Sequence, residues 1–213
     1  FVLLFLSCLM EFSWAAQGLV ILVIAPFLAV EKEDINPFCT APTVDDIFYA
    51  LIVDGASSGS RIRVYSWNDG RDGDISEILP SEETDDDFET EPGLSSYAPS
   101  GVGAGESLSK LIDAAKTLIP EEVWSKVPLN VFCTAGVRVL EPESFQSAVL
   151  DNTREYLSDP INNPFMLQSV SIITGEEEGA YGYISINNGN GRPSDQWDGV
   201  LDLGGASTHQ TFR

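Results

Sequence analysis

The sequence has little positive charge: 11 Lys and Arg residues stand against 33 Asp and Glu, and the formal net charge is -22. A surface this acidic repels nucleic acid and anionic membranes at long range, so we expect no nucleic-acid partner. The composition also rules out a broad basic patch as a binding device. If the chain binds a polyanion, backbone N–H groups and a divalent cation must hold the negative charge locally.

Cysteine and histidine are also scarce, with three Cys and one His in 213 residues. Three cysteines do not form a disulfide framework, and the spacing of Cys and His matches no metal-binding pattern. Cys133 ends an apolar run, which predicts a buried thiol, and a disulfide between Cys39 and Cys133 is the less favoured alternative. The hydrophobic content of 43% with four Trp residues supports a sizeable buried core.

The first residues of the chain are almost free of charge, and no Met begins the sequence. Residues 12–30, FSWAAQGLVILVIAPFLAV, have about the length of a helix that crosses a bilayer. We therefore expect residues 1–30 to be a single-pass membrane anchor, with a cleaved signal peptide or translated upstream sequence as alternatives. Residues 31–46 have the composition of a linker.

Apolar strand patterns alternate with helical patterns over residues 47–213, which predicts one α/β domain around a mixed central sheet. Pro142 suits the first turn of a helix, and three Glu residues suit the start of another, where the helix dipole favours negative charge. The acidic residues 69–92 are expected to form a mobile loop. We predict strands at 47–54, 61–67, 129–133, 170–174 and 199–203, helices at 106–118, 141–158 and 176–187, and a further strand starting before Arg213.

Two strand ends that lie far apart in the sequence carry the same local pattern. LIVDGASSGSR (51–61) and LDLGGASTHQT (201–211) each contain an apolar run, an Asp and a turn of small residues. Small residues let the backbone fold back with its N–H groups pointing inward, which forms an anion-binding nest. One such turn is usually only a turn, but two turns that face each other would hold one phosphate chain, while Asp54 and Asp202 hold one cation.

Two further segments carry candidate chemistry. The segment IITGEEEGAY (172–181) is either an acidic helix start or the source of a general base for the attack of water on a phosphoryl group. The segment FCTAGVR (132–138) places Thr134 at the end of a strand. Arg138 suits phosphate binding and a structural ion pair equally well.

In this order, the segments resemble the apyrase motifs of the ecto-nucleoside triphosphate diphosphohydrolase family. LIVDGASSGSRIRVYSW resembles the first motif, CTAGVRVL the second, ITGEEEGAYGYISIN the third and GVLDLGGAST the fourth. PGLSSYA (92–98) resembles the segment between the first two motifs. The resemblance covers residues 47–213 and implies a ribonuclease-H-like lobe of the actin, heat-shock-70 and sugar-kinase superfamily. It also implies a second, C-terminal lobe with a fifth motif and the base pocket, which is absent from this sequence.

The resemblance implies a role for each matching residue. Asp54 and Asp202 would hold Ca²⁺ or Mg²⁺, and Glu178 would be the general base. Ser207 and Thr134 would position the attacking water that hydrolyses a nucleoside di- or triphosphate, without a covalent phospho-enzyme. The protein would act outside the cell or in the Golgi or secretory lumen. The phosphates would be held by Gly55, Ala56, Ser57, Ser58, Gly59, Ser60, Gly204, Gly205 and Ala206.

The sequence departs from the resembled motifs in three ways. The family has Asp-Ala-Gly-Ser where this chain has Asp-Gly-Ala-Ser, so a positive φ at Ala56 would cost about 1 kcal/mol or more. His209 occupies the place of a Gln that helps to hold the water. The sequence ends after the fourth motif, so we expect the 213-residue chain alone to be inactive and to expose an apolar patch.

Two other functions remain open at this point. A non-catalytic, membrane-anchored nucleotide-binding or interaction protein with the same fold is favoured by His209 and by the absent lobe. The retained Asp54, Glu178 and Asp202 oppose that reading. An exopolyphosphatase of the same superfamily is disfavoured by GEEEGAYGY, which is particular to the apyrase pattern.

Overall fold

The computed structural model describes residues 47–68, 76–78, 85–189 and 196–212. These residues belong to two compact units, an N-terminal unit that ends at Ile173 and a C-terminal unit that begins at Thr174. The predicted anchor, linker and Cys39 lie outside the described residues. Among the residues that are described, no helix is long and apolar enough to cross a membrane.

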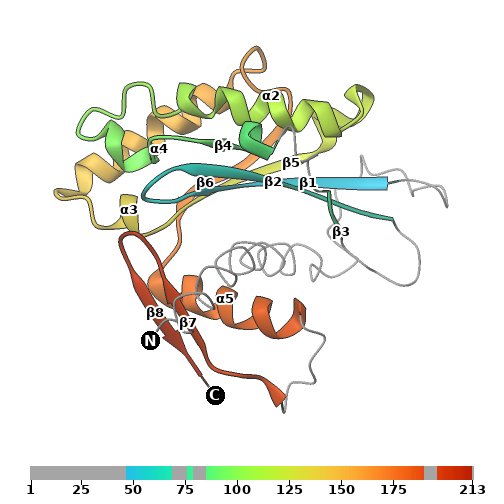
Figure 1. The fold of residues 1–213 in the computed structure, drawn as a ribbon. Helices are drawn as coiled ribbons and strands as arrows, with labels where there is room; N and C mark the ends of the chain where they lie inside the picture. The colour runs from blue at the N-terminus through green and yellow to red at the C-terminus, as the bar shows by residue number, and fades with distance from the viewer. Residues whose placement is uncertain (1–46, 69–75, 79–84, 190–195, 213) are drawn as a thin grey trace, which may run out of the picture. The chain divides into compact units, whose positions relative to one another are not determined.

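The N-terminal unit is built on a mixed sheet with the strand order β3-β2-β1-β5-β6 (Figure 1). The first three strands in the chain form an antiparallel meander, and β5 and β6 extend it in parallel with β1. This order confirms the predicted α/β class with a ribonuclease-H-like sheet. The strands are β1 (Ile47–Gly55), β2 (Ser60–Asn68), β3 (Ser76–Ile78), β4 (Glu89–Thr90), which pairs with β2, β5 (Pro128–Cys133) and β6 (Met166–Ile172).

The central position of β1 follows from its sequence. Its apolar run Ala50–Val53 is buried along its whole length, as expected for a strand that is covered on both faces. In the parallel pairing, Leu51 lies opposite Leu129 and Val53 opposite Val131, and all four side chains are fully buried. The run therefore places the Asp that follows it at the carboxyl end of the sheet.

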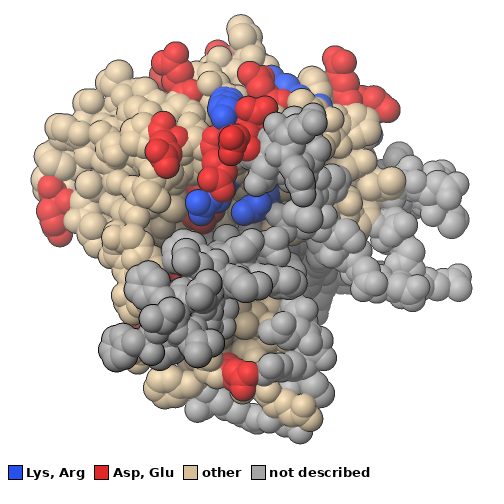
Figure 2. All heavy atoms as spheres, viewed as in Figure 1, with Lys and Arg blue, Asp and Glu red and all other residues tan. Residues whose placement is uncertain are grey.

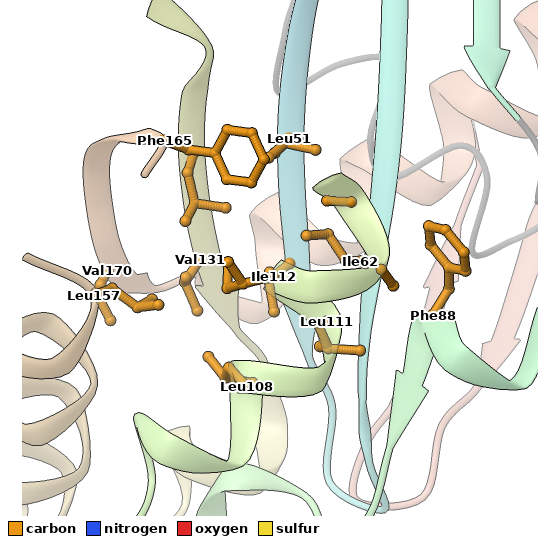
Figure 3. Packing of buried hydrophobic residues seen from close by; sticks show 14 of the residues in the cluster. Leu51, Ile62, Phe88, Leu108, Leu111, Ile112, Val131, Leu157, Phe165 and Val170 are labelled. Carbon is orange, nitrogen blue, oxygen red and sulfur yellow. The ribbon is translucent and has the colours of Figure 1, made fainter. Parts of the chain in front are cut away.

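Helices α2 and α4 lie on the same side of this sheet (Figure 1). The buried residues of α2 include Leu111 and Ile112, which point into the core with residues of β1, β2 and β5 (Figure 3). The buried residues of α4 are four positions apart, at Val149, Thr153 and Leu157, as an amphipathic helix requires. The helical elements of this unit are η1 (Asp85–Phe88), η2 (Leu94–Tyr97), η3 (Glu106–Leu108), α2 (Ser109–Leu118), η4 (Glu121–Lys126), α3 (Ala135–Arg138) and α4 (Glu143–Ser158).

Some predicted boundaries differ from the structure. Helix α4 begins at Glu143, and Pro142 is its N-cap residue rather than part of its first turn. Strand β6 begins at Met166, before the predicted start, because its pairing with β5 begins where Pro128 lies opposite Met166. The pairing also ends at Ile172, so the predicted strand over 170–174 was too short at its start and too long at its end.

The acidic segment over residues 69–92 is only partly the loop that was predicted, since its described residues include β3, η1 and β4. Phe88 is 4% exposed and anchors the segment to the core. Lys110 on α2 donates to the main-chain oxygen of Asp86 at 2.7 Å and lies 3.4 Å from the carboxylate of Asp87. One buried aromatic side chain and one Lys thus hold an otherwise acidic run.

The C-terminal unit consists of helix α5 (Gly175–Gly189) and a hairpin of β7 (Val200–Leu203) and β8 (Thr208–Thr211), with α5 packed on both strands. Strand β8 confirms the prediction of a further strand. The predicted strand at 199–203 is confirmed as β7, and it pairs with β8 in a separate two-stranded sheet. Along β7, Asp202 is half-buried while Leu201 and Leu203 are exposed.

Candidate functional site

The first predicted phosphate turn connects β1 to β2. Gly55 and Ser60 form the last pair of the two strands, so the turn itself is the four residues 56–59. Ser60 is only 1% exposed, and Gly55 is also buried. The four turn residues 56–59 are more exposed than Gly55 and Ser60, so they are the better candidates for phosphate contact in this segment.

Glycines from two other predicted segments pack directly on this turn. The N–H of Gly93 donates to the carbonyl of Ser58 at 3.0 Å, and a Cβ on Gly93 would lie 2.5 Å from the carbonyl oxygens of Ala56 and Ser57. A Cβ on Gly136 would lie 2.7 Å from the Cα of Ser57. The segments PGLSSYA and CTAGVRVL therefore meet the first turn, and only glycine permits these backbone approaches.

The expected strain at Ala56 is not present. No residue other than glycine has a positive φ among the residues that the structure describes, so Ala56 lies outside the left-handed region. The neighbouring Gly55 also has no positive φ. The order Gly-Ala in place of Ala-Gly is therefore compatible with this turn.

Asp54 lies at the end of β1, half-buried and opposite Phe132 of β5. Burial, and then the charge of Asp54, raise the pKa of the Cys133 thiol to about 12. Cys133 is thus the buried, neutral thiol that the sequence predicted. Thr134 is 7% exposed, and its N–H donates to the carbonyl of Gly55 at 3.3 Å, which places it beside the start of the turn.

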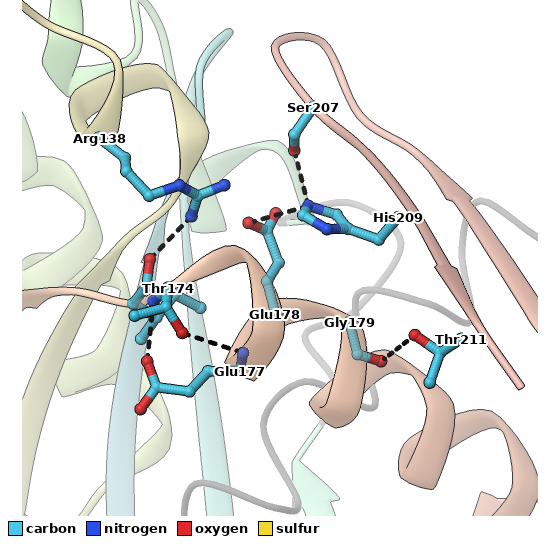
Figure 4. Close-up of polar contacts among 9 residues, drawn as sticks. Arg138, Thr174, Glu177, Glu178, Gly179, Ser207, His209 and Thr211 are labelled. Atoms are coloured by element: carbon cyan, nitrogen blue, oxygen red, sulfur yellow. Dashed lines mark hydrogen bonds and ion pairs between the residues drawn. The ribbon is translucent and has the colours of Figure 1, made fainter. Parts of the chain in front are cut away.

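In the C-terminal unit, Thr174 and Glu177 form a capping box at the start of α5 (Figure 4). The N–H of Thr174 donates to Glu177 Oε2 at 2.8 Å, and the N–H of Glu177 donates to Thr174 Oγ1 at 3.1 Å. Glu176 and Glu177 are exposed, whereas the Glu178 side chain is only 12% exposed. The three consecutive carboxylates therefore differ, and Glu178 is the one held inside the unit.

His209 contacts two of the other predicted catalytic residues, Glu178 and Ser207 (Figure 4). His209 Nε2 lies 3.3 Å from Glu178 Oε2 and 3.0 Å from Ser207 Oγ. The His209 side chain is 14% exposed. Helix α5 and the hairpin thus bring a carboxylate and a hydroxyl into contact with the same imidazole nitrogen.

Asp202 lies next to this group, since it is the cross-strand partner of His209. Burial raises the pKa of Asp202, the negative charge of Glu178 raises it further, and His209 lowers it. Beyond Asp202, the turn residues Gly204, Gly205 and Ala206 are exposed, and the N–H of Gly204 donates to the carbonyl of Ser207 at 2.8 Å. This second turn offers its backbone to solvent.

Three residues of the site were not predicted from the sequence. Gly93 and Gly136 support the first turn, and the glycine pattern in their segments was the available signal. Thr211 Oγ1 donates to the carbonyl of Gly179 at 3.0 Å, and a Cβ on Gly179 would lie 2.9 Å from that hydroxyl (Figure 4). Arg138, which had two readings, donates to the carbonyl of Ile173 at 2.7 Å, so it has a structural contact.

Acidic side chains dominate the surroundings of the few basic ones (Figure 2). Arg61 pairs with Glu89, and Lys116 lies 2.8 Å from Asp113. The charges of these cations are therefore already compensated by neighbouring carboxylates.

The candidate metal ligands are the carboxylates of Asp54 and Asp202. Within the described ranges, no group of three or more His, Cys, Asp or Glu residues forms a metal-binding cluster. Asp54 belongs to the N-terminal unit and Asp202 to the C-terminal unit. Carboxylate oxygens suit Ca²⁺ and Mg²⁺, and Mg²⁺ is commonly held by one or two carboxylates with water and substrate phosphates. A cation beside Asp202 would also relieve the repulsion from Glu178 that raises the pKa of Asp202. By donor type, each of these carboxylates suits Ca²⁺ or Mg²⁺.

The fold is thus of the ribonuclease-H-like α/β class, with small-residue turns at the ends of β1 and β7. Residues 41–213 match the GDA1/CD39 (nucleoside phosphatase) family, and the chain belongs to this family.

Three relatives are reported with their sequence identity and with the share of each protein that the match covers. It is 38% identical to a guanosine-diphosphatase of Schizosaccharomyces pombe, with 77% of this chain and 29% of that protein covered. It is 36% identical to ectonucleoside triphosphate diphosphohydrolase 5 of Gallus gallus (84% and 42% covered) and to the Golgi apyrase of Saccharomyces cerevisiae (77% and 29%). The chain therefore spans less than half the length of these curated relatives.

Proposed function

We propose that the protein is a metal-dependent phosphohydrolase that removes the terminal phosphate of nucleoside tri- and diphosphates. Family membership supports the reaction class, and the relatives named as a guanosine-diphosphatase, an apyrase and a triphosphate diphosphohydrolase support the substrate class. The observation that carries the mechanism is the position of Glu178. It is the one carboxylate of the EEE run that is held inside its unit and contacts His209 and, through it, Ser207.

In this mechanism Glu178 accepts the proton of the water that attacks the terminal phosphorus. A general base in this role contributes a rate factor of about 10² to 10⁴. Its low exposure separates it from bulk water, so its carboxylate has fewer competing partners than those of Glu176 and Glu177. The Ser207 hydroxyl, which contacts His209 beside Glu178, would orient this water, and Thr134 at the end of β5 would also orient it.

The two small-residue turns would hold the phosphates through backbone N–H groups, which carry no charge and act at short range. This mode of binding suits a chain with a net charge of -22, because it needs no basic patch. A Ca²⁺ or Mg²⁺ ion held by Asp54 and Asp202 would neutralise phosphate charge and stabilise the charge that develops in the reaction. The first turn belongs to the N-terminal unit and the second to the C-terminal unit.

We further propose that the protein acts in the secretory lumen or outside the cell, attached by residues 1–30. The names of the relatives support this, since they include a Golgi apyrase and an ectonucleoside enzyme. The apolar composition of residues 12–30 supports the anchor.

The function is tested by measuring phosphate release from ATP, ADP, GDP and UDP by the full-length protein with Ca²⁺, with Mg²⁺ and with a chelator. We expect metal-dependent release, and a loss of about 10² to 10⁴ in kcat for Glu178→Gln. Glu176→Gln is the matched control, because this side chain is exposed one helix position earlier. We expect it to retain full activity.

The outcomes of this assay distinguish a hydrolase from a non-catalytic binding protein and test the role of Glu178. Metal-dependent release that Glu178→Gln abolishes and Glu176→Gln preserves supports the hydrolase. A folded full-length protein that binds nucleotide without releasing phosphate supports the non-catalytic binding protein instead. Equal losses in the two variants would show that Glu178 is not the base.

A further inference from the structure

His209 contacts Glu178 and Ser207 through the same ring nitrogen. The distances from Nε2 are 3.3 Å to Glu178 Oε2 and 3.0 Å to Ser207 Oγ (Figure 4). In a nucleophilic triad, the imidazole uses one nitrogen for the serine and the other for the acid, so that a proton passes across the ring. A single nitrogen cannot serve both ends of such a relay. This geometry therefore argues against Ser207 as a nucleophile activated by His209.

The charges around Nε2 indicate which ring nitrogen carries the hydrogen, since the distances alone fit either tautomer. A bare Nε2 would direct its lone pair at the Glu178 carboxylate, and the two groups would repel each other where Glu178 is 12% exposed. An Nε2–H, in contrast, is attracted to both oxygens and is shared between them as a three-centre hydrogen bond. The Ser207 oxygen then accepts from Nε2, and its own O–H remains available to donate to another group.

We infer that His209 is a positioning residue, whose Nε2–H fixes the Glu178 carboxylate and directs the Ser207 hydroxyl outward, toward the water that is to react. This inference rests on the proposed function. It assigns to His209 a role through Glu178 and Ser207, in place of the direct hold on water that the Gln of the resembled motif implies. The imidazole is rigid beyond its second side-chain torsion, whereas Gln has one more torsion to order.

The backbone keeps the imidazole within reach of Glu178. Thr211 lies two positions after His209 on the same face of β8, and its hydroxyl donates to the carbonyl of Gly179 at 3.0 Å. Gly179 follows Glu178 directly, and a Cβ at Gly179 would lie 2.9 Å from Thr211 Oγ1 and 3.6 Å from the Cβ of His209. The absence of a side chain at Gly179 thus lets β8 approach the first turn of α5 closely enough for the contact.

The kinetic test compares His209→Phe with His209→Gln in the full-length protein, using GDP hydrolysis. Phe keeps a planar ring but has no N–H, so we expect kcat to fall about 10²-fold, the size of effect that a misplaced catalytic group produces. We expect KM to change by less than about threefold, because the lost interaction serves the reaction rather than binding. His209→Gln restores a donor and should recover part of kcat.

Gln210→Ala is the matched control, since Gln210 is the next residue of β8 and is exposed. We expect this variant to keep the kcat of the wild type. A His209→Phe protein with a wild-type kcat would overturn the inference. So would a fall in kcat that Gln210→Ala reproduces, because that would report a general disturbance of the hairpin.

A second readout does not depend on activity. In a long-range ¹H–¹⁵N spectrum of the protein labelled at histidine, the signal missing from His209→Gln identifies this ring. We expect the Nε2–H form, with chemical shifts that change in Glu178→Gln. A bare Nε2 would overturn the inference whatever the kinetics show. If the wild-type protein releases no phosphate, the proposed function fails, and this spectrum alone decides whether His209 holds Glu178.

Discussion

The turns that follow β1 and β7 have similar sequences but very different support. The first turn follows a strand whose run Ala50–Val53 is buried, and the backbones at Gly93 and Gly136 pack directly against the turn. The second turn joins two short strands, and its residues 204–206 are exposed. The first turn is therefore held by the core of its unit, whereas the second depends on local hydrogen bonds.

This difference shows that the conformation of a phosphate-type turn can be fixed either by packing from outside the turn or by hydrogen bonds within it. At the first turn, close packing against the rest of the unit excludes alternative backbone conformations. At the second turn, the bond from the N–H of Gly204 to the carbonyl of Ser207 closes the loop on itself. We infer that the two turns differ in local stability, and three measurements test this difference.

The largest difference is expected between a buried leucine of the N-terminal unit and an exposed leucine of the C-terminal unit. Leu111 of α2 is fully buried, so Leu111→Ala should lower the free energy of unfolding by about 2–5 kcal/mol. Leu203 of β7 is 45% exposed, so Leu203→Ala should cost less than about 1 kcal/mol. Equilibrium urea unfolding of the full-length protein measures both. A large loss for Leu203→Ala would mean that this side chain packs against another part of the protein.

A smaller difference is expected between the glycines that accompany the turns. Gly93→Ala would place a Cβ 2.5 Å from two carbonyl oxygens and should cost about 2 kcal/mol, because backbone must move. In Gly204→Ala the nearest atom is the Ser207 carbonyl oxygen at 3.2 Å, and the cost should stay below about 1 kcal/mol. Urea midpoints of the two variants test this. Equal shifts would contradict the proposed difference in support.

The alkaline pH dependence of stability tests the core beneath the first turn. Burial and the charge of Asp54 raise the pKa of Cys133 from 9.0 to about 12. Between these pH values the folded thiol keeps its proton and the unfolded thiol loses it. The free energy of unfolding should therefore fall as pH rises above 9, by up to about 1.4 kcal/mol per pH unit from this group.

Comparison with Cys133→Ala isolates this contribution, since other groups titrate in both proteins. We expect the wild type to lose stability more steeply than the variant from pH 8 to pH 10. Parallel slopes in the two proteins would show that the thiol ionises in the folded state and that the site beneath the turn is open to water.

Much of the N-terminal unit was predictable from the sequence because its strands are continuous apolar runs and its helices have clear amphipathic spacing. The residues of β1, β5 and α2 illustrate this, since burial on both strand faces and on one helix face leaves a strong pattern. The start of β6 was missed because Met166 and Leu167 follow a polar, proline-containing segment, and only the pairing with β5 defines them as strand.

The sequence indicated the candidate residues of the site but not the contacts between them. The sequence identified Glu178, Ser207 and His209, but the contact of all three through one nitrogen depends on how β8 packs on α5. Likewise, an EEE run does not reveal that Glu177 caps the helix while Glu178 turns inward. The separate pairing of β7 with β8 was also hidden, since a short strand pattern does not specify its partner.

The boundary between the two units has a mechanical consequence. Ile173 accepts from Arg138 and donates its N–H to the carbonyl of Cys133, so its polar backbone atoms are both bound in the N-terminal unit. The N–H of Thr174 is bound by Glu177 and its carbonyl by the N–H of Glu178. One peptide bond thus connects two residues whose backbone groups are hydrogen-bonded, each within its own unit. A backbone rotation between Ile173 and Thr174 must therefore either break one of these hydrogen bonds or move the first turn of α5. Glu178 lies in that turn, so it would move with it.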